Sequence, residues 1–361
     1  MLDVLTLLVI NSGSSSLRAG LFHGANGLRH WHYAAVGEHQ MAFARLMADL
    51  EGVRLDGIVH RVVHGGTVTE AVRWIDEDER QRLQSIVDLA PLHLPTNLRG
   101  IDLCLDHFDV PQVACFDTAF HGTLSEMVAR LPVPPQFGLR KYGFHGLSYA
   151  SVARRLPQWM GETAQGRIVV MHLGHGSSAC LLEGLRSVDT TMGYSPAGGM
   201  IMGTRSGDLD PGVMLALARR MNPAELEHTV FHRMGLLALS EGLSSDMQTL
   251  LADARPQASR AVEGYCRSVA RHVAGMVTVS GGLDALVFTG GIGEHAAWVR
   301  REVIRHLAFL GFELDESANA NHAMLLAVPD SLPILMVPAD EEEQMRHLAT
   351  ALLESPRRAI A

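Results

Sequence analysis

Cysteine is scarce in this chain of 361 residues. The four cysteines, Cys104, Cys115, Cys180 and Cys266, are widely spaced, and none of them forms a CxxC pair. Paired spacings of that kind are what redox and zinc motifs use. We therefore expect four reduced thiols in the core of a cytoplasmic protein.

Long apolar runs and an excess of positive charge are also missing. No stretch of about 18 uncharged apolar residues occurs, so no transmembrane helix is indicated. The short apolar run 4–10 follows Asp3 and is expected to be a buried strand, not a signal peptide. Lys and Arg number 30 against 39 Asp and Glu, a net charge of −9. This balance disfavours nucleic acid and anionic membranes as partners.

The composition is that of a globular protein of two domains. Hydrophobic residues make up 47% of the chain, too many for a disordered protein. A chain of 361 residues is longer than a typical domain with a single hydrophobic core, so we expect two domains.

One local pattern occurs twice. Residues 7–22 read LLVINSGSSSLRAGLF, and residues 168–182 read IVVMHLGHGSSACLL. Each is an apolar strand, a Gly/Ser turn and a second strand. Such turns place backbone N–H groups and hydroxyls in a concavity that accommodates anions. Either turn alone is equally compatible with an ordinary hairpin, but the pair favours a duplicated fold that holds phosphates.

The remaining elements alternate in the manner of an α/β protein. We expect strands at 57–63, 111–116, 284–288 and 333–337, and helices at 41–50, 76–89, 97–107, 148–156, 258–280 and 297–310. A further helix opens at Asp210-Pro211, with Asp as N-cap and Pro in the first turn. Another follows the last strand. Residues 195–212 contain too much glycine for a regular element and are expected to form a functional loop.

Two arginines stand beside glycine-rich segments. Arg61 lies in HRVVHGG and Arg205 lies in MGTRSGD. A guanidinium group holds carboxylate or phosphate through two parallel hydrogen bonds. The alternative for each is a buried ion pair with a neighbouring Asp.

Histidines gather near the same segments. The spacing of His172 and His175 raises the question of zinc, but residues i and i+3 point apart where a strand enters a turn, and no acidic third ligand has matching spacing. Hydrogen bonding to a transferring phosphoryl group fits these histidines better. A structural role for any one of them remains open.

Two carboxylates follow predicted strands directly. Asp117 lies in FDTAFH and Glu341 in PADEEE, where an α/β protein would build a Mg²⁺ site with few protein ligands and several waters. Asp208 and Asp210 compete for that role, although Asp210 is better explained as a helix cap. TGGIGE at 289–294 follows a strand and would let backbone approach a nucleotide closely.

These motifs together resemble the acetate kinase family, which has an actin-like and sugar-kinase-like phosphotransferase fold. The motifs stand in family order over nearly the whole chain: NSGSSSL (11–17), HRVVHGG (60–66), APLH (90–93), FDTAFH (116–121), YGFHG (142–146), HLG-GSS (172–178), VDTTMG (188–193), MGTRSGDLDPG (202–212), GGIGE (290–294) and VPADEE (337–342). The resemblance implies two actin-like, ribonuclease H-like domains from an internal duplication, with a nucleotide cleft between them. We expect residues 1–120, completed by 345–361, to form the first domain and residues 121–344 the second.

The resemblance also implies a role for each motif residue. The catalytic set would be Asp117, His145, Arg205 and Arg61, with His145 and Arg205 stabilising the transition state and His93 and His172 nearby. The substrate carboxylate and its methyl group would contact Arg61, Val63, Leu92, Phe144 and Pro196. Asn11 and Glu341 would hold Mg²⁺ or Mn²⁺, with Asp117 organising the metal's waters. Nucleotide contacts would come from Ser14, Ser16, Arg18, His172, Gly174, His175, Gly176, Asp246, Met247, Gln248, Gly290, Gly291, Ile292, Gly293 and His295.

Departures from the family pattern lie mainly on the nucleotide side. His175 and His295 replace the family's usual Asn, Met247-Gln248 replaces Phe-Arg, and SPAGG at 195–199 replaces TPLEG. The acyl-pocket and catalytic motifs match the family, so these departures bear on the phosphoryl donor and not on the reaction.

The expected activity is reversible, ATP-dependent phosphorylation of a short-chain carboxylate to acyl phosphate and ADP, by a cytoplasmic homodimer. Acetate is the first candidate acid. Propionate, butyrate or a donor such as pyrophosphate are alternatives. An actin-like nucleotide-binding module without catalysis is the alternative from a different class.

Overall fold

The computed structural model describes residues 4–13, 16–34 and 39–354, which divide into two compact units. Unit 1 contains Met1–Gly122, Gly146–Ser151 and Asp340–Ala361, and unit 2 contains Thr123–His145 and Val152–Ala339. Within the described residues, no helix combines the length and apolar character needed to traverse a bilayer.

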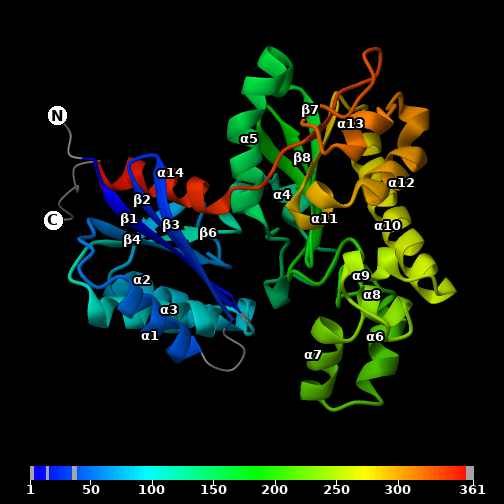
Figure 1. Cartoon of the computed structure of the whole chain (residues 1–361). Coiled ribbons are helices and arrows are strands. Elements are labelled where there is room, and N and C mark those ends of the chain that lie inside the picture. Colours follow the sequence, from blue (N-terminus) through cyan, green and yellow to red (C-terminus); the bar gives the residue numbers. More distant parts are fainter. Residues whose placement is uncertain (1–3, 14–15, 35–38, 355–361) are drawn as a thin grey trace. The chain divides into compact units, whose positions relative to one another are not determined.

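Unit 1 is built on a six-stranded sheet in the order β3-β2-β1-β4-β6-β5 (Figure 1). Its elements are β1 Thr6–Ser12, β2 Ser16–His23, β3 Asn26–Ala34, α1 His39–Asp49, β4 Gly57–Val62, β5 Val72–Trp74, α2 Glu77–Ser85, α3 Leu94–His107, β6 Gln112–Phe116 and α14 Glu341–Leu353. Strands β1, β4 and β6 are parallel, whereas β2, β3 and β5 pair antiparallel. The carboxyl ends of β1, β4 and β6 therefore meet at one edge of the sheet.

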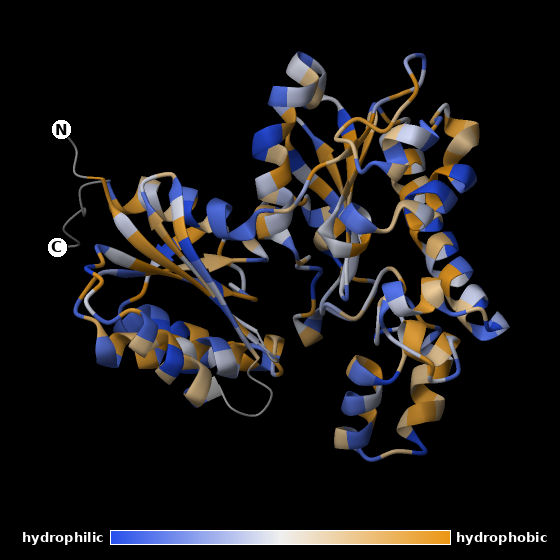
Figure 2. Ribbon diagram, in the orientation of Figure 1, coloured by the Kyte–Doolittle hydropathy of each residue, from blue (hydrophilic) through white to orange (hydrophobic). Residues whose placement is uncertain are grey.

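Helices cover both faces of this sheet because the central strands are apolar on both sides. Leu8 and Ile10 of β1 pack with α1, and Leu7 and Val9 of the same strand pack with Met345 of α14. Figure 2 shows the apolar residues along these strands. The first hydrophobic run in the sequence is thus a core strand, because alternate residues of β1 pack against helices on opposite faces of the sheet.

Unit 2 is built on a five-stranded sheet in the order β11-β10-β7-β8-β9. Its elements are α4 Glu126–Ala129, β7 Arg167–Leu173, β8 Ser177–Glu183, β9 Arg186–Thr190, α6 Pro211–Ala218, α7 Pro223–His232, α8 Gly235–Leu239, α9 Met247–Ala252, α10 Pro256–Ser280, β10 Ala285–Thr289, α11 Gly290–His295, α12 Ala297–Leu307, α13 Glu316–Ala320 and β11 Ile334–Met336. Helix α5, Gly146–Met160, begins in unit 1 and continues in unit 2. The largest core cluster joins the β7 and β10 strands to α10 and α12.

The two sheets repeat one arrangement. The order β3-β2-β1-β4-β6 in unit 1 corresponds to β9-β8-β7-β10-β11 in unit 2, with antiparallel pairs on one side and parallel pairs on the other. The hairpin that the sequence shows twice is β1–β2 in one sheet and β7–β8 in the other. The predicted internal duplication is therefore confirmed in the strand order, and β5 is an addition to the first copy.

Most expected elements are present with small shifts at their ends. Asp210 caps α6 by accepting a hydrogen bond from the backbone of Gly212, 2.6 Å away, with Pro211 at the first helical position. The helix expected over 76–89 ends at Ser85 and continues as a short 3-10 turn at Val87–Leu89. The helix expected from 148 begins at Gly146.

A buried histidine in unit 1 predicts acid sensitivity. His60 is 3% exposed, and its Nε2 lies 2.8 Å from the Oε1 of Gln112. Burial lowers the pKa of His60 from 6.5 to about 4, although the hydrogen bond opposes this shift. At a pH between these two pKa values, the unfolded chain binds more protons than the folded protein does. The contribution of neutral His60 to the free energy of unfolding is therefore complete above about pH 6.5. About 3 kcal/mol of it is lost as the pH falls toward 4.

Chemical denaturation between pH 7.5 and 4 tests this effect. His60→Asn, which cannot titrate there, should be less stable at pH 7 but flatten the pH dependence of the free energy of unfolding. The exposed His107→Asn is the matched control and should keep the wild-type slope. Equal slopes in all three proteins would show that His60 does not control acid stability.

Candidate active site

The first group of predicted site residues lies at the sheet edge where β1, β4 and β6 end. Asn11, Arg61 and Asp117 come from these three strands or directly after them, and Glu341 is the first residue of α14. The Arg61 guanidinium hydrogen-bonds the Asp117 carboxylate and donates from Nη1 to Asn11 Oδ1 over 3.1 Å. Its Nε lies 3.8 Å from Glu341 Oε2. We call these four residues the Arg61 cluster.

Charge compensation organises the Arg61 cluster. The Asp117 side chain is 2% exposed and that of Arg61 is 18% exposed. Burial alone would lower the pKa of Arg61, but the carboxylates of Asp117 and Glu341 raise it overall. The buried ion pair that the sequence left open as an alternative is thus present. It holds the guanidinium at the sheet edge, where its remaining donors can face a ligand.

Asn97 of α3 fastens the strand ends around this cluster, and sequence inspection did not single it out. Its amide donates to the Ser12 carbonyl over 2.8 Å and accepts from the Val63 backbone over 3.1 Å. Ser12 Oγ is buried and has no hydrogen-bond partner in the described part of the chain. The position of Ser12 directly before the Gly/Ser turn was the sequence signal that could have identified this residue.

The β1–β2 turn is described only in part. Gly13 donates to the Ser16 carbonyl over 2.9 Å and closes the turn, whereas Ser14 lies outside the described residues. Arg18 is exposed and stands opposite Asn11 in the β1–β2 pairing. Directly opposed residues share a face of the sheet, so Arg18 lies on the same face as Asn11.

The second group lies in unit 2 around the β7–β8 turn, and we call His145, His172, Ser178 and Arg205 the Arg205 cluster. His145 Nδ1 lies 2.8 Å from Ser178 Oγ, and its ring stacks on His172 with centroids 4.2 Å apart. His145 has φ 59°, a left-handed conformation that a non-glycine residue adopts at a cost. The side chain is therefore held in a specified orientation just before α5.

His145 and Arg205 converge over Gly176. A Cβ atom on Gly176 would lie 3.0 Å from Arg205 Nη2 and 3.2 Å from His145 Nε2. The absence of a side chain at this position leaves both donors room to reach a common ligand. The Arg205 guanidinium, joined by His145 in the tautomer that carries its proton on Nε2, places donors near one point above a glycine turn. This arrangement suits an anion such as a phosphoryl group.

Arg205 lacks a compensating carboxylate. Its Nη1 donates to the Pro196 carbonyl over 2.7 Å, and none of the carboxylates in the described ranges pairs with it. Burial lowers its pKa to about 10. A partly buried cation without a counter-charge is costly unless an anion arrives. Of the two arginines, Arg205 is therefore the one whose positive charge is left for a bound anion to neutralise.

His175 borders this cluster. Its carbonyl accepts from the Gly203 backbone over 3.1 Å, and a Cβ on Gly203 would lie 2.8 Å from its Nδ1. Desolvation, followed by the positive charge of Arg205, lowers the pKa of His175, while Asp246 raises it. His175 thus contacts the Arg205 loop and is expected to be mainly neutral near pH 7.

A second glycine turn adjoins the first. Gly290 has φ 77°, and a Cβ there would lie 2.8 Å from the Leu173 carbonyl oxygen. A Cβ on Gly174 would lie 4.0 Å from the Gly291 nitrogen. The β7–β8 turn and the start of α11 are therefore packed closely, and together they present backbone N–H groups from Gly176 and Gly291. The Gly174 N–H closes the turn by donating to the Gly176 carbonyl over 3.1 Å.

The remaining predicted nucleotide residues occupy different environments. Asp246 caps α9, accepting from the Thr249 backbone over 2.7 Å. Met247 is 3% exposed and belongs to the hydrophobic core of unit 2, whereas Gln248 and His295 are exposed. Ile292 is half-buried. Of the two side chains that replace Phe-Arg, only Gln248 is open to solvent.

The four predicted acyl-pocket residues come from both units. Val63 and Leu92 belong to unit 1, and Phe144 and Pro196 belong to unit 2. Val63 is 8% and Phe144 is 2% exposed, while Leu92 and Pro196 are half-buried.

No ready-made cage for a transition metal is found in the described ranges, where no three His, Cys, Asp or Glu side chains are placed to hold an ion. The oxygens of Asn11 and Glu341 in the Arg61 cluster nevertheless fit the preference of Mg²⁺, which uses one or two protein oxygens and keeps several waters.

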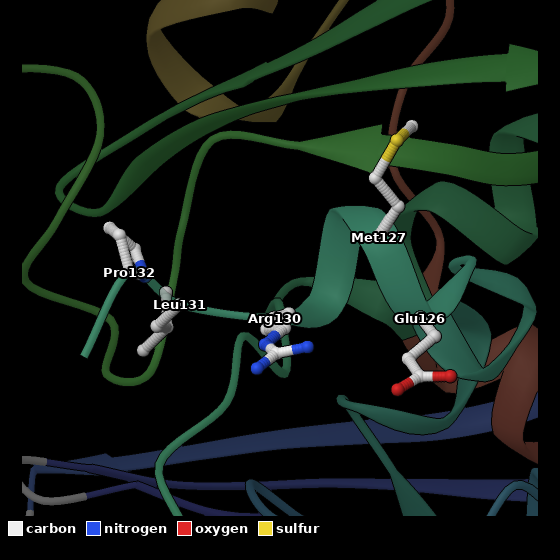
Figure 3. Close-up of a pocket in the computed structure, with 5 residues that line it drawn as sticks. All are labelled: Glu126, Met127, Arg130, Leu131 and Pro132. Atoms are coloured by element: carbon white, nitrogen blue, oxygen red, sulfur yellow. The ribbon is translucent and has the colours of Figure 1, made fainter. Parts of the chain in front are cut away.

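A surface hollow of about 540 Å³ lies elsewhere in unit 2 (Figure 3). Glu126, Met127, Arg130, Leu131 and Pro132 line it. Met127 points away from Glu126 and is 83% exposed. None of these residues belongs to a motif predicted to carry chemistry.

Comparison with known proteins agrees with this architecture. A family model described as the Acetokinase family matches residues 25–347. An acetate kinase of Rhodopseudomonas palustris is 40% identical, over 93% of this chain and 95% of that protein. The crystal structure of a propionate kinase from Francisella tularensis superposes with a TM-score of 0.88 at 30% identity, covering 95% of this chain and 98% of that one. That of Porphyromonas gingivalis acetate kinase gives 0.87 at 28%, covering 97% and 100%.

The duplicated sheets and these structural neighbours define a kinase of the two-domain actin-like class. Within that class, the match over most of the chain and the identity to curated relatives are decisive. The chain belongs to the Acetokinase family.

Proposed function

We propose that the protein transfers the γ-phosphoryl group of ATP reversibly to a short-chain carboxylate, with acetate as the first candidate, giving acyl phosphate and ADP. Family membership supports the reaction class. The observation that carries the proposal is the convergence of Arg205 Nη2 and His145 Nε2 over Gly176, because phosphoryl transfer depends on positioned donors around the moving charge.

The roles follow from the chemistry of each cluster. The carboxylate nucleophile is ionised at neutral pH, so no general base is required. Arg61, fixed by Asp117 and Asn11, is assigned to the substrate carboxylate. Arg205 and His145 neutralise and orient the phosphoryl oxygens. The backbone N–H groups of the two glycine turns are assigned to the nucleotide.

Mg²⁺ or Mn²⁺ is proposed as the cofactor, held by Asn11 and Glu341, and when bound it supplies positive charge to the phosphates. We further propose that the two compact units are the two expected domains. A homodimer in the cytoplasm is also proposed, the location being supported by four buried cysteines with free thiols.

An activity survey of the purified chain tests the reaction. Acyl phosphate is trapped with hydroxylamine after incubation with acetate, propionate or butyrate and with ATP, GTP or pyrophosphate. We expect acyl hydroxamate formation that requires a divalent cation and is fastest with ATP and acetate. Nucleotide binding by calorimetry without any acyl phosphate would instead support a non-catalytic actin-like module. Turnover with pyrophosphate alone would change the donor and not the reaction class.

Substitution of Val63 is expected to change acid preference. Val63→Ala removes two methyl groups and so enlarges the proposed apolar pocket. One methylene of substrate in such a pocket is worth roughly 1–3 kcal/mol. The ratio of kcat/KM for propionate over acetate should therefore rise about tenfold. Val59→Ala changes a fully buried residue of β4, the strand that Val63 directly follows. It is the matched control, and it should lower stability and leave the ratio unchanged. An unaltered preference in Val63→Ala would remove Val63 from the pocket.

A further inference from the structure

Arg300 of α12 is a fully buried cation that the proposed chemistry does not use. It is 0% exposed, and its donors reach carbonyl oxygens, a side-chain amide oxygen and a histidine ring. Nη1 donates to the carbonyls of Gly293 and Glu294, each over 2.8 Å, while Nε and Nη2 donate to the side chain and carbonyl of Asn319 over 2.7 and 2.8 Å. Nη2 also lies 3.2 Å from His322 Nδ1. No carboxylate in the described ranges forms an ion pair with Arg300.

Such an arrangement is costly, and the fold gains a specific contact from it. Burial lowers the pKa of Arg300 to about 10, because a low-dielectric interior disfavours the charged form. What the guanidinium meets is the carboxyl end of α11, where carbonyl oxygens lack helical partners and carry partial negative charge. Nη1 alone satisfies the two adjacent carbonyls, while Nε and Nη2 bind Asn319. A single ammonium group cannot reproduce this divergent set of donors.

The opposite end of α11 is held by the helix's own glutamate. Glu294 Oε1 accepts from the backbone of Gly290 over 2.9 Å and from that of Ala339 over 3.0 Å. Helix α11 has only six residues, too few to be stable through its own hydrogen bonds. Glu294 therefore fixes its first residue, and Arg300 fixes its last turn.

The segment held in this way is the second glycine turn. Gly290 is in a left-handed conformation against the Leu173 backbone, and Gly291 is exposed. A displacement of α11 moves the backbone N–H of Gly291 relative to the β7–β8 turn that it adjoins. Displacements of about 1 Å are enough to weaken contacts that depend on positioned donors.

We infer that Arg300 is a positioning residue for nucleotide binding, acting through the carbonyls of Gly293 and Glu294 to set the turn Gly290–Gly293. This inference rests on the proposed function, because it takes that turn to be a nucleotide contact. It concerns a residue of α12, outside the turn itself, and it predicts an effect that is selective for the nucleotide.

The experiment compares Arg300→Lys with its neighbour Arg301→Gln in the full-length protein. Arg301 is exposed and pairs with Glu316 on the surface, so Arg301→Gln should behave as wild type. For Arg300→Lys we expect the KM for ATP and the calorimetric Kd for ADP to rise about tenfold. The KM for the carboxylate should change by less than twofold. All assays are run at a temperature where circular dichroism shows the variants to be fully folded.

The outcomes separate this inference from the proposed function. Wild-type protein that neither binds ADP nor forms acyl phosphate would overturn the proposed function. Suppose that the wild-type protein is active. An unchanged KM for ATP in Arg300→Lys, or equal rises in its KM values for ATP and for the carboxylate, would then overturn the inference and leave the proposed function intact. If Arg300→Lys does not fold, Glu294→Ala releases the other end of α11 and is held to the same criterion.

Discussion

Arg205→Ala is expected to lower kcat by about 10³-fold or more while changing the Kd for ADP far less. An arginine aimed at transferring phosphoryl charge contributes on that scale, and Arg205 reaches the space over Gly176 without a carboxylate to neutralise it. Removing the side chain should also relieve a buried positive charge, so the free energy of unfolding should not fall. Steady-state turnover and chemical denaturation measure the two quantities.

Two further variants make the Arg205 experiment specific. Arg205→Lys should remain poor, because a point charge cannot replace a fork of donors. Arg220→Ala removes an exposed arginine two residues beyond the end of α6 and should retain wild-type kcat. Turnover above about a tenth of wild type in Arg205→Ala would refute the assignment.

Arg61→Met is expected to damage both stability and catalysis. It leaves the Asp117 carboxylate buried and without its cation, which typically costs about 3–5 kcal/mol of unfolding free energy. It also removes the donor assigned to the substrate carboxylate, for which a loss of about 10²–10³ in kcat is expected. Denaturant titration and acyl phosphate formation measure the two effects.

The double variant Arg61→Met/Asp117→Leu separates these effects. Replacing both charges by apolar groups should restore most of the stability, but it cannot restore turnover. If the double variant is as unstable as Arg61→Met, the buried charge is not the cause. If Arg61→Met works at near wild-type rate, Arg61 serves only as a structural ion pair.

Local patterns predicted much of the fold. The two hairpins were recognisable because strand, Gly/Ser turn and strand leave a signature within about fifteen residues. The Asp210-Pro211 start of α6 was equally local. The end of α2 was missed by several residues because nothing between Ser85 and Leu89 breaks a helix strongly, and the tighter 3-10 turn depends on packing.

The site was predictable as a set of residues but not as a set of contacts. Arg61 and Asp117 are 56 positions apart in the sequence. Only the parallel register of β4 and β6 brings these two residues together. The burial of Met247 could not be read from its segment, since Asp246 and Gln248 beside it are exposed. Arg300 carries no motif, and its role emerges only from the two carbonyls that it meets.

The position of α14 has a consequence for the order of events during synthesis. Met345 and Ala349 of this last helix cover Leu7, Val9 and Val59 in the first sheet. A nascent chain that has not reached residue 340 therefore leaves that face of the sheet open to water. The sheet of unit 2 is encoded without interruption by residues 167–336, so it can be completed earlier. Unit 1 begins first on the ribosome and is expected to finish folding last, exposed meanwhile to chaperones that recognise apolar strands.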